Sequence, residues 1–336
     1  MVKTAVVILN YNGRNYLETF LPKVNQYNDD YTIFIADNAS TDDSVDFLQE
    51  HYPALPLIKL PHNLGFSQGY NETLKQIQAE YYILLNSDVE VTPRWSLPLI
   101  QLMENNPSIA ACQPKILDYN DKSRFEYAGA AGGFIDYLGY PFCRGRLFDT
   151  LEKDTGQYND TTPIFWATGA CLAIRAEVFH SLGGFDKDFF AHMEEIDLCW
   201  RIRSSGLQVY YCGDSHVFHI GGGTLSKSNP HKTYLNFRNG LTMLYKNTEQ
   251  KRLYRSIGLR IGLDLIAAIR FLVSGSPKET MAVLRAITHF VNQRVGSKQR
   301  REERYKTKHP IPEIYPRSIV KAYFIDKIRY FSELMP

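Results

Sequence analysis

AVVILNYN, residues 5–12, joins a continuous apolar and β-branched run to a polar turn near the start of the chain. An apolar run of this kind, without polar alternation, is typical of a strand that is buried on both faces of a parallel sheet. Three further apolar runs follow, and helical patterns separate them. Strand–helix alternation predicts right-handed crossovers, a mostly parallel central sheet and the α/β class. We expect strands at 5–9, 31–36, 55–60 and 81–85, and helices at about 14–26, 42–51 and 67–78.

The later part of the chain has a different pattern. Residues 119–163 are rich in Gly, Tyr and Asp and show weak periodicity, so we expect long loops there. Order returns with expected strands at 169–175 and 207–211 and a helix at 195–204. From about Pro230 the pattern is helical, with more Arg and Lys. The sequence therefore predicts a first domain over 1–228 and a C-terminal helical region over 229–336.

Composition excludes several classes of protein. The net charge of +2 gives no reason to expect a nucleic-acid partner. Five cysteines without a CxxC pair suit a reducing compartment and indicate no zinc site. The apolar start is too short for a signal peptide, and no run of eighteen uncharged apolar residues predicts a transmembrane helix. We therefore expect a cytoplasmic protein.

Polar residues gather where the expected strands end. Ligands of parallel sheets bind beyond the carboxyl ends of the strands, which places 10–12, 37–38 and 86–88 at a candidate site. The carboxylate of Asp88 could bind Mg²⁺ or Mn²⁺, although a helix cap would also account for it. Asp37 could accept a hydrogen bond from the ring N–H of uracil or thymine. Neither a Walker loop nor a GxGxxG motif is present.

Three carboxylates crowd into four positions at Glu194, Glu195 and Asp197, where a helix is expected to begin. Helix capping accounts for one or two of them, and an acceptor hydroxyl needs a carboxylate as general base. Further on, His219 precedes the glycines at 221–223. This histidine could complete a metal site with Asp88 while the glycine loop closes over phosphates.

Taken in this order, the segments resemble the family 2 glycosyltransferases of the GT-A fold, and most closely the bacterial rhamnosyltransferase-like branch that builds cell-surface polysaccharides. The likeness covers about residues 3–225. Two positions depart from the family pattern, because Asn86 and Glu195 stand where the family commonly has Asp. The segments that carry the likeness are 6–13, 37–40, 63–66, 168–171, 194–199 and 219–222.

The resemblance implies an inverting, metal-dependent hexosyl- or deoxyhexosyltransferase of GT-A fold with a C-terminal helical extension. The donor would be a UDP- or dTDP-sugar, the cofactor Mg²⁺ or Mn²⁺, and the acceptor a saccharide or lipid-linked saccharide. Glu195 is implied as the base, Glu194 and Asp197 as supporting groups, and Asp88 and His219 as metal ligands. Donor contacts are expected from Asn10, Tyr11, Asn12, Asp37, Asn38, Asn63, Gly65, Asn71 and Asn86, and acceptor contacts from Trp166, Thr168, Gly169 and Ala170.

The C-terminal region carries an apolar segment, 257–273, which is interrupted by Arg260, Asp264 and Arg270. On a helix these charges share one broad sector, so the segment could lie in a membrane interface with its basic side chains toward lipid headgroups. The basic residues of 298–308 would add attraction to anionic lipid. A helix docked on the protein or on a second subunit, in a homodimer, is the other interpretation. A membrane contact would place the protein at the inner face of the plasma membrane.

Three other functions are compatible with parts of the pattern. A nucleotidyltransferase would share the sheet and the metal carboxylate, but it should carry a Gly-rich, basic loop where this chain has Asn10–Gly13. A non-catalytic carbohydrate-binding relative would account for the departures at Asn86 and Glu195. A retaining transferase is the third, and the acid cluster at the start of a helix favours the inverting pattern instead.

Overall fold

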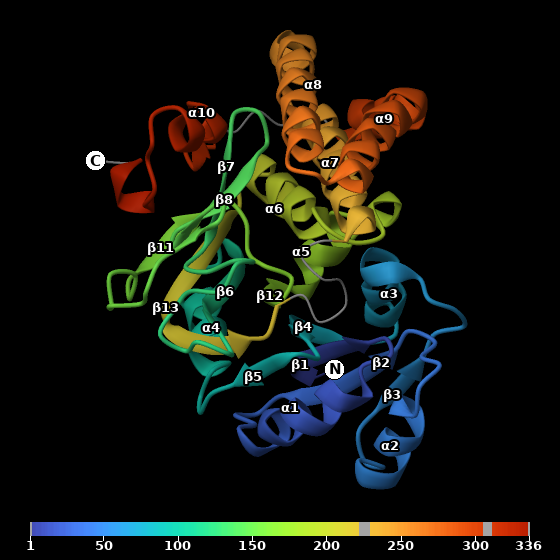
Figure 1. The fold of residues 1–336 in the computed structure, drawn as a ribbon. Helices are drawn as coiled ribbons and strands as arrows, with labels where there is room; N and C mark the ends of the chain where they lie inside the picture. The colour runs from blue at the N-terminus through green and yellow to red at the C-terminus, as the bar shows by residue number, and fades with distance from the viewer. Residues whose placement is uncertain (1, 222–228, 305–310, 335–336) are drawn as a thin grey trace.

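The computed structural model describes residues 2–221, 229–304 and 311–334, and a nine-stranded sheet lies at its centre (Figure 1). The strands of this sheet are β1 Val2–Asn10, β2 Thr32–Asp37, β3 Leu57–Lys59, β4 Ala79–Asn86, β5 Val89–Val91, β6 Ile109–Asp118, β11 Thr161–Ile164, β12 Cys171–Arg175 and β13 Gln208–His219. They lie in the order β11-β13-β6-β12-β4-β1-β2-β3, and β5 pairs with β13.

The amino-terminal half of the sheet is parallel, as predicted. Strand β1 lies between β2 and β4, and β2 pairs with β3. The register sets Asn10 opposite Asp37 and Leu9 opposite Asn86, so the polar residues that follow these strands share one edge of the sheet. The connecting helices are α1 Arg14–Gln26, α2 Ser44–His51 and α3 Gly65–Leu74.

The other half of the sheet mixes strand directions. Strand β12 runs antiparallel to both β4 and β6, whereas β6 and β13 are parallel. Because β12 is antiparallel to β4, the segment that enters β12 lies at the carboxyl end of β4. The amide of Asn86 accordingly donates to the carbonyl of Ala170, at 3.0 Å. This reversal brings residues 166–170, the acceptor segment, to the edge of the sheet that carries the expected donor residues.

The region expected to form long loops forms a second sheet instead. Its strands are short, and the side chains of the longest one are all buried. Strands of two to four residues are too short to show a period, so the sequence pattern could not reveal them. The sheet has the order β10-β9-β8-β7-β14. Its strands are β7 Gly133–Asp136, β8 Pro141–Cys143, β9 Arg146–Leu147, β10 Thr150–Leu151 and β14 Ile314–Tyr315.

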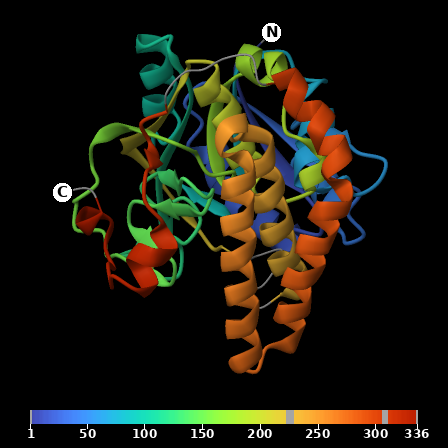
Figure 2. The ribbon, with the colours of Figure 1, turned by 90° about the horizontal axis from the view of Figure 1, so that it is seen from above.

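The helical character expected after Pro230 is confirmed over residues 230–304. Helices α7 Pro230–Asn247, α8 Gln250–Val273 and α9 Pro277–Arg304 form a bundle, and the α8–α9 hairpin projects beyond the rest of the molecule (Figures 1 and 2). The last described segment returns to the second sheet through β14 and the short helix α10 Ile319–Phe324. None of the described helices is long and apolar enough to cross a membrane.

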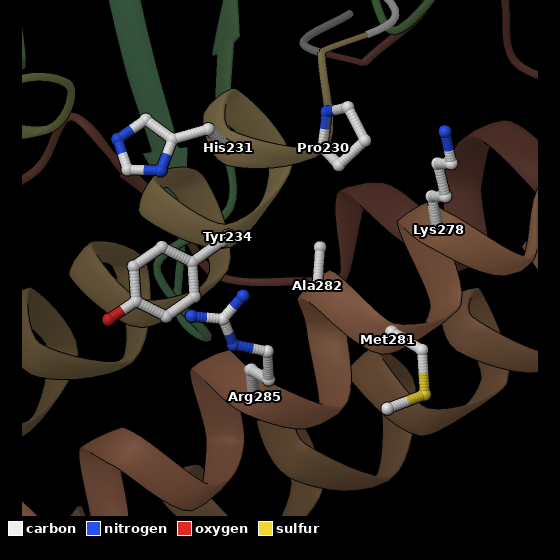
Figure 3. A pocket seen from close by; sticks show the side chains of 7 residues that line it. All are labelled: Pro230, His231, Tyr234, Lys278, Met281, Ala282 and Arg285. Atoms are coloured by element: carbon white, nitrogen blue, oxygen red, sulfur yellow. The ribbon is translucent and has the colours of Figure 1, made fainter.

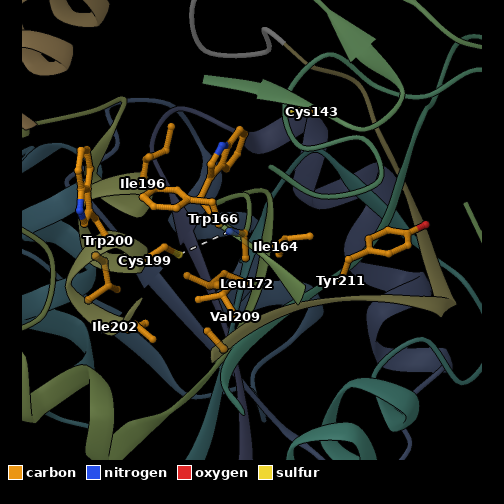
Figure 4. Close-up of a cluster of buried hydrophobic side chains, with 14 of the residues drawn as sticks. Cys143, Ile164, Trp166, Leu172, Ile196, Cys199, Trp200, Ile202, Val209 and Tyr211 are labelled. Atoms are coloured by element: carbon orange, nitrogen blue, oxygen red, sulfur yellow. Dashed lines mark hydrogen bonds between the residues drawn. The ribbon is translucent and has the colours of Figure 1, made fainter. Parts of the chain in front are cut away.

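Three helices cover the sheet alongside these elements: α4 Leu97–Asn105, α5 Ala176–Ser181 and α6 Glu194–Ser204. Figure 4 shows apolar side chains of α6 packed against side chains from the central sheet and from the segment before β12. The amide of Ala167 donates to Sγ of Cys199 on α6, at 3.5 Å. The acceptor segment is therefore bonded to Asn86 of β4 through Ala170 and to Cys199 of α6 through Ala167.

Candidate active site

The turns that follow β1 and β2 are bonded to each other through side chains. Nδ2 of Asn10 donates to Oδ1 of Asp37 at 3.3 Å and to Oγ of Ser40 at 3.2 Å. Oδ2 of Asp37 accepts from the amide of Ser40, and Asn12 bonds to both Ser40 and Thr41. Oδ1 of Asn10 is buried and has no hydrogen-bond partner among the described residues. This oxygen is therefore available to a donor group on a ligand.

A second turn, before α3, is tied to the same edge. Oδ1 of Asn38 accepts from the amide of Leu64 at 2.9 Å, and its Nδ2 reaches Asn63 Oδ1 and the carbonyl of Gly65. Gly65 has φ +71°, and a Cβ there would lie 2.5 Å from the ring of Phe190. Only glycine fits this position without a shift. The start of α3 thus packs directly against the segment that leads into α6.

Asp88 and His219 form the candidate metal pair. Nε2 of His219 lies 3.2 Å from Oδ1 of Asp88, because β5 follows Asp88 directly and pairs with β13 at His219. The other ring nitrogen, Nδ1, lies 3.5 Å from Oε2 of Glu126. Burial opposes the charged imidazolium, but the carboxylates of Asp88 and Glu126 outweigh this effect and raise the pKa of His219 to about 10.

Strand β13 is longer than the expected strand at 207–211, so His219 lies inside it rather than after it. His216 is exposed and His219 is buried, because residues three apart on a strand point to opposite faces of the sheet. Gly221 follows, and a Cβ at this position would lie 2.5 Å from Oε1 of Glu126. The remaining glycines of the expected loop, Gly222 and Gly223, lie outside the described residues.

Glu194 and Glu195 begin helix α6, and each has an Oε2 atom that is buried without a hydrogen-bond partner among the described residues. Burial raises the pKa of Glu195 to about 7, against the hydrogen bonds that its carboxylate accepts from backbone amides. Burial also raises the pKa of Glu194, and the neighbouring Glu195 charge raises it further. A carboxyl group whose pKa lies near neutrality is suited to proton transfer.

The turn before α6 has an unusual backbone. Phe190, His192 and Met193 have φ values of 61°, 69° and 74°, in the left-handed region. Such residues cost roughly 1–3 kcal/mol each and persist where the surroundings hold them. Helix α7 supplies the stabilising contacts. Nδ2 of Asn239 donates to the carbonyls of Phe189, Ala191 and His192 at 3.0, 2.9 and 2.7 Å. A residue beyond Pro230 therefore fixes the position at which the acid helix begins.

The acceptor segment is bonded to both elements that carry the candidate carboxylates. Ala170 bonds to Asn86 beside the metal pair, while Ala167 bonds to α6 behind the acid pair. Thr168 accepts from the Ala170 amide through its hydroxyl. Gly169 lies under the ring of Phe66, which is 3.0 Å from where a Cβ would be. The structure thus brings residues 168–170, Asp88 and the start of α6 into one region.

Other expected site residues have different surroundings. Trp166 is 4% exposed and its indole N–H donates to the carbonyl of Phe134, so its ring belongs to the core and its expected acceptor contact is not supported. The amide of Asn71 bonds twice to the backbone of Phe185. Asp197 is buried and bonds to Arg201, Lys246 and Asn247. Tyr11, by contrast, is exposed at the rim of the site.

Residues 5–183, more than half of the 336-residue chain, match the sequence model of the family described as glycosyl transferase family 2. The chain belongs to this family. It is 28% identical over 231 residues to N-acetylglucosaminyl-diphospho-decaprenol L-rhamnosyltransferase of Mycobacterium tuberculosis (strain ATCC 25618 / H37Rv), which covers 64% of this chain and 75% of the relative. It is 24% identical over 222 residues to rhamnosyltransferase WbbL of Escherichia coli (strain K12), which covers 64% of this chain and 82% of the relative.

Solved structures of similar fold are also glycosyltransferases. A crystal structure of GalNAc-T7 with UDP, GalNAc and Mn²⁺ matches 73% of this chain and 48% of its own, with a TM-score of 0.57 and 16% identity. Mannosyltransferase PcManGT from Pyrobaculum calidifontis, in complex with GDP-Man and Mn²⁺, matches 86% of this chain and 87% of its own, with a TM-score of 0.54 and 14% identity. At these identities the likeness concerns the fold, and it confirms the expected GT-A fold.

Two residues of this family 2 glycosyltransferase were not predicted from the sequence. Glu126 lies in the region that was expected to form loops, and Asn239 lies in the helical region beyond the family likeness. No motif contains either residue, and no spacing relates them to the site. Their contacts depend on how the second sheet and α7 pack against the catalytic half, which a local pattern does not record.

Proposed function

We propose that this family 2 glycosyltransferase inverts configuration at the sugar that it transfers from a UDP- or dTDP-linked donor to an acceptor hydroxyl. The observation that supports the proposal is a pair of hydrogen bonds: the Ala170 carbonyl accepts from the backbone amide of Asn86, two residues before Asp88, and the Ala167 amide donates to Cys199 on the helix that Glu195 helps to begin. The Asp88 pair lies at the carboxyl edge of the sheet, where a donor diphosphate would bind, and Glu195 opens a helix beyond the acceptor segment. An inverting transfer needs such groups on opposite faces of the sugar.

The residues of the candidate metal pair fit a divalent cation. The carboxylate of Asp88 and the imidazole of His219 are side by side, and a cation would replace the proton that the carboxylates stabilise on Nε2 while the Glu126 carboxylate faces Nδ1. No cluster of three or more potential ligands occurs within the described residues, so donor phosphate oxygens and water would complete the coordination. Bound Mg²⁺ or Mn²⁺ would neutralise charge on the leaving diphosphate.

The protein's own side chains would bind the donor and transfer the proton. Asn10, Asp37 and Asn38 would bind the nucleoside part, and Oδ1 of Asn10 would accept a hydrogen bond from it. Glu195 would take the proton of the acceptor hydroxyl as that oxygen forms its bond to the anomeric carbon. The bond between that carbon and the diphosphate oxygen breaks at the same time, and the electron pair leaves with the diphosphate. No covalent enzyme intermediate forms.

The relatives suggest the substrates. The Mycobacterium tuberculosis relative is named for transfer of L-rhamnose to a diphospho-decaprenol-linked N-acetylglucosamine, and WbbL is named a rhamnosyltransferase. We therefore propose a deoxyhexose or hexose donor and a lipid-linked saccharide acceptor, in cell-surface polysaccharide synthesis. A lipid-linked acceptor implies peripheral contact with the inner face of the plasma membrane.

Calorimetric titration of UDP and dTDP, with and without Mn²⁺, tests the donor site. Wild-type protein is expected to bind one of them in a metal-dependent manner, and Asp88→Asn is expected to lose this dependence because the amide is a poor ligand for a hard cation. Asp46→Asn, an exposed change on α2, serves as the matched control. If wild-type protein binds neither nucleotide under any condition, the donor site is wrong and a non-catalytic carbohydrate-binding function is favoured.

The role of Glu126 gives a further prediction. Glu126→Gln keeps the shape and the contact with the Ala128 amide but removes the charge that faces His219. Groups that orient a metal-bound histidine typically contribute about 10–100-fold to metal affinity. We expect Mn²⁺ affinity, measured by titration with saturating nucleotide, to fall by about this factor. Glu50→Gln on α2 is the control, and equal affinities in the two variants would rule out the role.

A further inference from the structure

The α8–α9 hairpin exposes an unusual amount of apolar surface. Of the sixteen well-exposed large apolar side chains in the described part of the chain, ten lie between residues 250 and 293. The most exposed aliphatic ones belong to one face of the second half of α8, and the first turns of α9 continue this surface. This set, the hairpin face, comprises Leu265, Ile266, Ile269, Leu272, Val273, Met281 and Leu284.

Helix α8 buries its charges and exposes its aliphatic side chains. Arg260 and Asp264 are 3% and 0% exposed, and Nε of Arg260 donates to Oδ1 of Asp264 at 2.9 Å. Arg260 also donates to the carbonyls of Leu138 and Gly139, and Tyr140 donates to Asp264. Arg260 and Asp264 therefore do not face lipid headgroups, contrary to the expectation for this sector, and only its third charge, Arg270, is exposed. The polar sector anchors α8 to the second sheet, and the opposite, apolar face points outward.

The charges around the hairpin face have one sign. Between residues 250 and 293 the exposed charged side chains are all basic, whereas Asp264 is buried and Glu279 is partly buried. Two copies of this surface would bring like charges together, so a second copy of the chain is a poor partner. An anionic surface with an apolar interior suits both features. The basic side chains are Lys251, Arg252, Arg255, Arg270, Lys278 and Arg285.

A small pocket of about 140 Å³ lies between α7 and α9, next to the hairpin face. Figure 3 shows Lys278 and Met281 on the α9 side and the ring of Tyr234 on the α7 side, with Arg285 between the helices and close to that ring. The guanidinium of Arg285 lies 5.5 Å from the centre of the Tyr234 ring. Met281 of the hairpin face and the cationic side chains of Lys278 and Arg285 line this pocket together, which suits a lipid interface with phosphate headgroups.

We propose that the hairpin face docks on an anionic lipid bilayer. The aliphatic side chains at the end of α8 and the start of α9 enter the interface, and the flanking Lys and Arg side chains contact lipid phosphates. This docking rests on the proposed function, because a bilayer bound at the hairpin face would present the lipid-linked acceptor to the enzyme. The side chains of 294–304 are not described and 305–310 lie outside the described residues, so the added attraction expected from the basic residues at 298–308 stays a prediction.

Vesicle co-sedimentation of the full chain, without any substrate, tests the proposal. We expect binding to vesicles with a third phosphatidylglycerol, weaker binding to pure phosphatidylcholine, and loss of binding at high salt because salt screens the charges. The triple variant Ile266→Gln, Ile269→Gln, Val273→Gln should bind at least about tenfold more weakly, since it removes most of the inserted apolar area. Ile325→Gln with Tyr330→Gln, at exposed sites outside the hairpin, is the control.

Glutamine is a good helix former, and the substituted side chains are exposed, so the triple variant should keep its fold. Unchanged nucleotide binding by the variant would show this directly, and it separates failure of docking from failure of the donor site. Equal vesicle binding by the triple variant and wild type would overturn the proposal. A dimer of wild-type protein in light scattering that the triple variant loses would also overturn it, and would assign the hairpin face to a second copy.

Discussion

Glu195→Gln is expected to lower kcat by about 10²–10⁴-fold, the contribution of a positioned general base. Glutamine keeps the size of the side chain and cannot accept the hydroxyl proton. The affinity for UDP or dTDP should stay within about twofold, because Glu195 lies on α6 and the donor residues lie at the sheet edge. Single-turnover transfer, together with nucleotide titration, measures both quantities.

Glu194→Gln is the matched comparison, since the two residues are neighbours and burial raises the pKa of both. If Glu195 is the base, Glu194→Gln should lower kcat much less. It should also shift the pH dependence of the rate, because the charges of the two groups affect each other. A larger loss in Glu194→Gln than in Glu195→Gln would exchange the two roles.

The pKa of Glu195 also sets the direction of two pH effects. A base must be deprotonated, so the rate of wild-type enzyme should rise with pH through about 7. Stability should change in the opposite direction. Because the pKa of Glu195 is raised in the folded state, its protonated form contributes to the free energy of unfolding. This contribution is complete below pH 4.5, the ordinary pKa of Glu, and is lost as pH rises through about 7. Glu195→Gln should therefore have the higher Tm at pH 8, with the difference vanishing near pH 4.

The sequence predicted the first half of the fold because its signals are local. Helix 14–26 has the expected bounds, and the strands expected near 5–9 and 81–85 each extend a few residues further. Continuous apolar runs of this length that are rich in β-branched residues and alternate with amphipathic helical patterns are typical of buried strands. Because the register of parallel strands aligns their carboxyl ends, the grouping of Asn10, Asp37 and Asn86 followed from the strand assignment alone.

The remainder depended on tertiary contacts. Spacing shows that Arg260 and Asp264 share a sector of a helix, but it does not show which way that sector faces. The direction is decided by the carbonyls of Leu138 and Gly139, which lie in the turn between β7 and β8 of a sheet that the pattern did not reveal. Trp166 is a similar case. The resemblance implies an acceptor contact for Trp166, and only the nearby Phe134 carbonyl shows that its indole N–H is already bonded in the core.

Lys246→Met is expected to lower the free energy of unfolding by about 3–5 kcal/mol, the usual cost of leaving a buried charge without its partner. Lys246 is 2% exposed, and its ammonium group bonds to Asp186 and to Asp197, the latter at 3.0 Å. Methionine replaces the aliphatic part of the side chain and none of the charge. Urea unfolding measures the loss. Lys321→Met, which removes an exposed pair with Asp326, should cost less than about 1 kcal/mol.

The same network decides what Asp197 does. Its contacts with Arg201, Lys246 and Asn247 favour a structural role over the supporting catalytic role that the resemblance implies. Asp197→Asn should then lower stability while the enzyme that stays folded keeps a kcat close to that of wild type. A large fall in kcat at unchanged stability would instead place Asp197 in the chemistry.

These contacts also bear on the domain boundary expected at 228/229. Lys246 and Asn247 belong to α7, whereas Asp186 and Asp197 flank the start of α6, and Asn239 holds the turn between them. A chain that ends at residue 228 would leave those buried carboxylates without Lys246 and would release the left-handed turn. We therefore propose that α7 folds as part of the catalytic unit. Loss in Lys246→Met no larger than in Lys321→Met would contradict this and would support an independent C-terminal region.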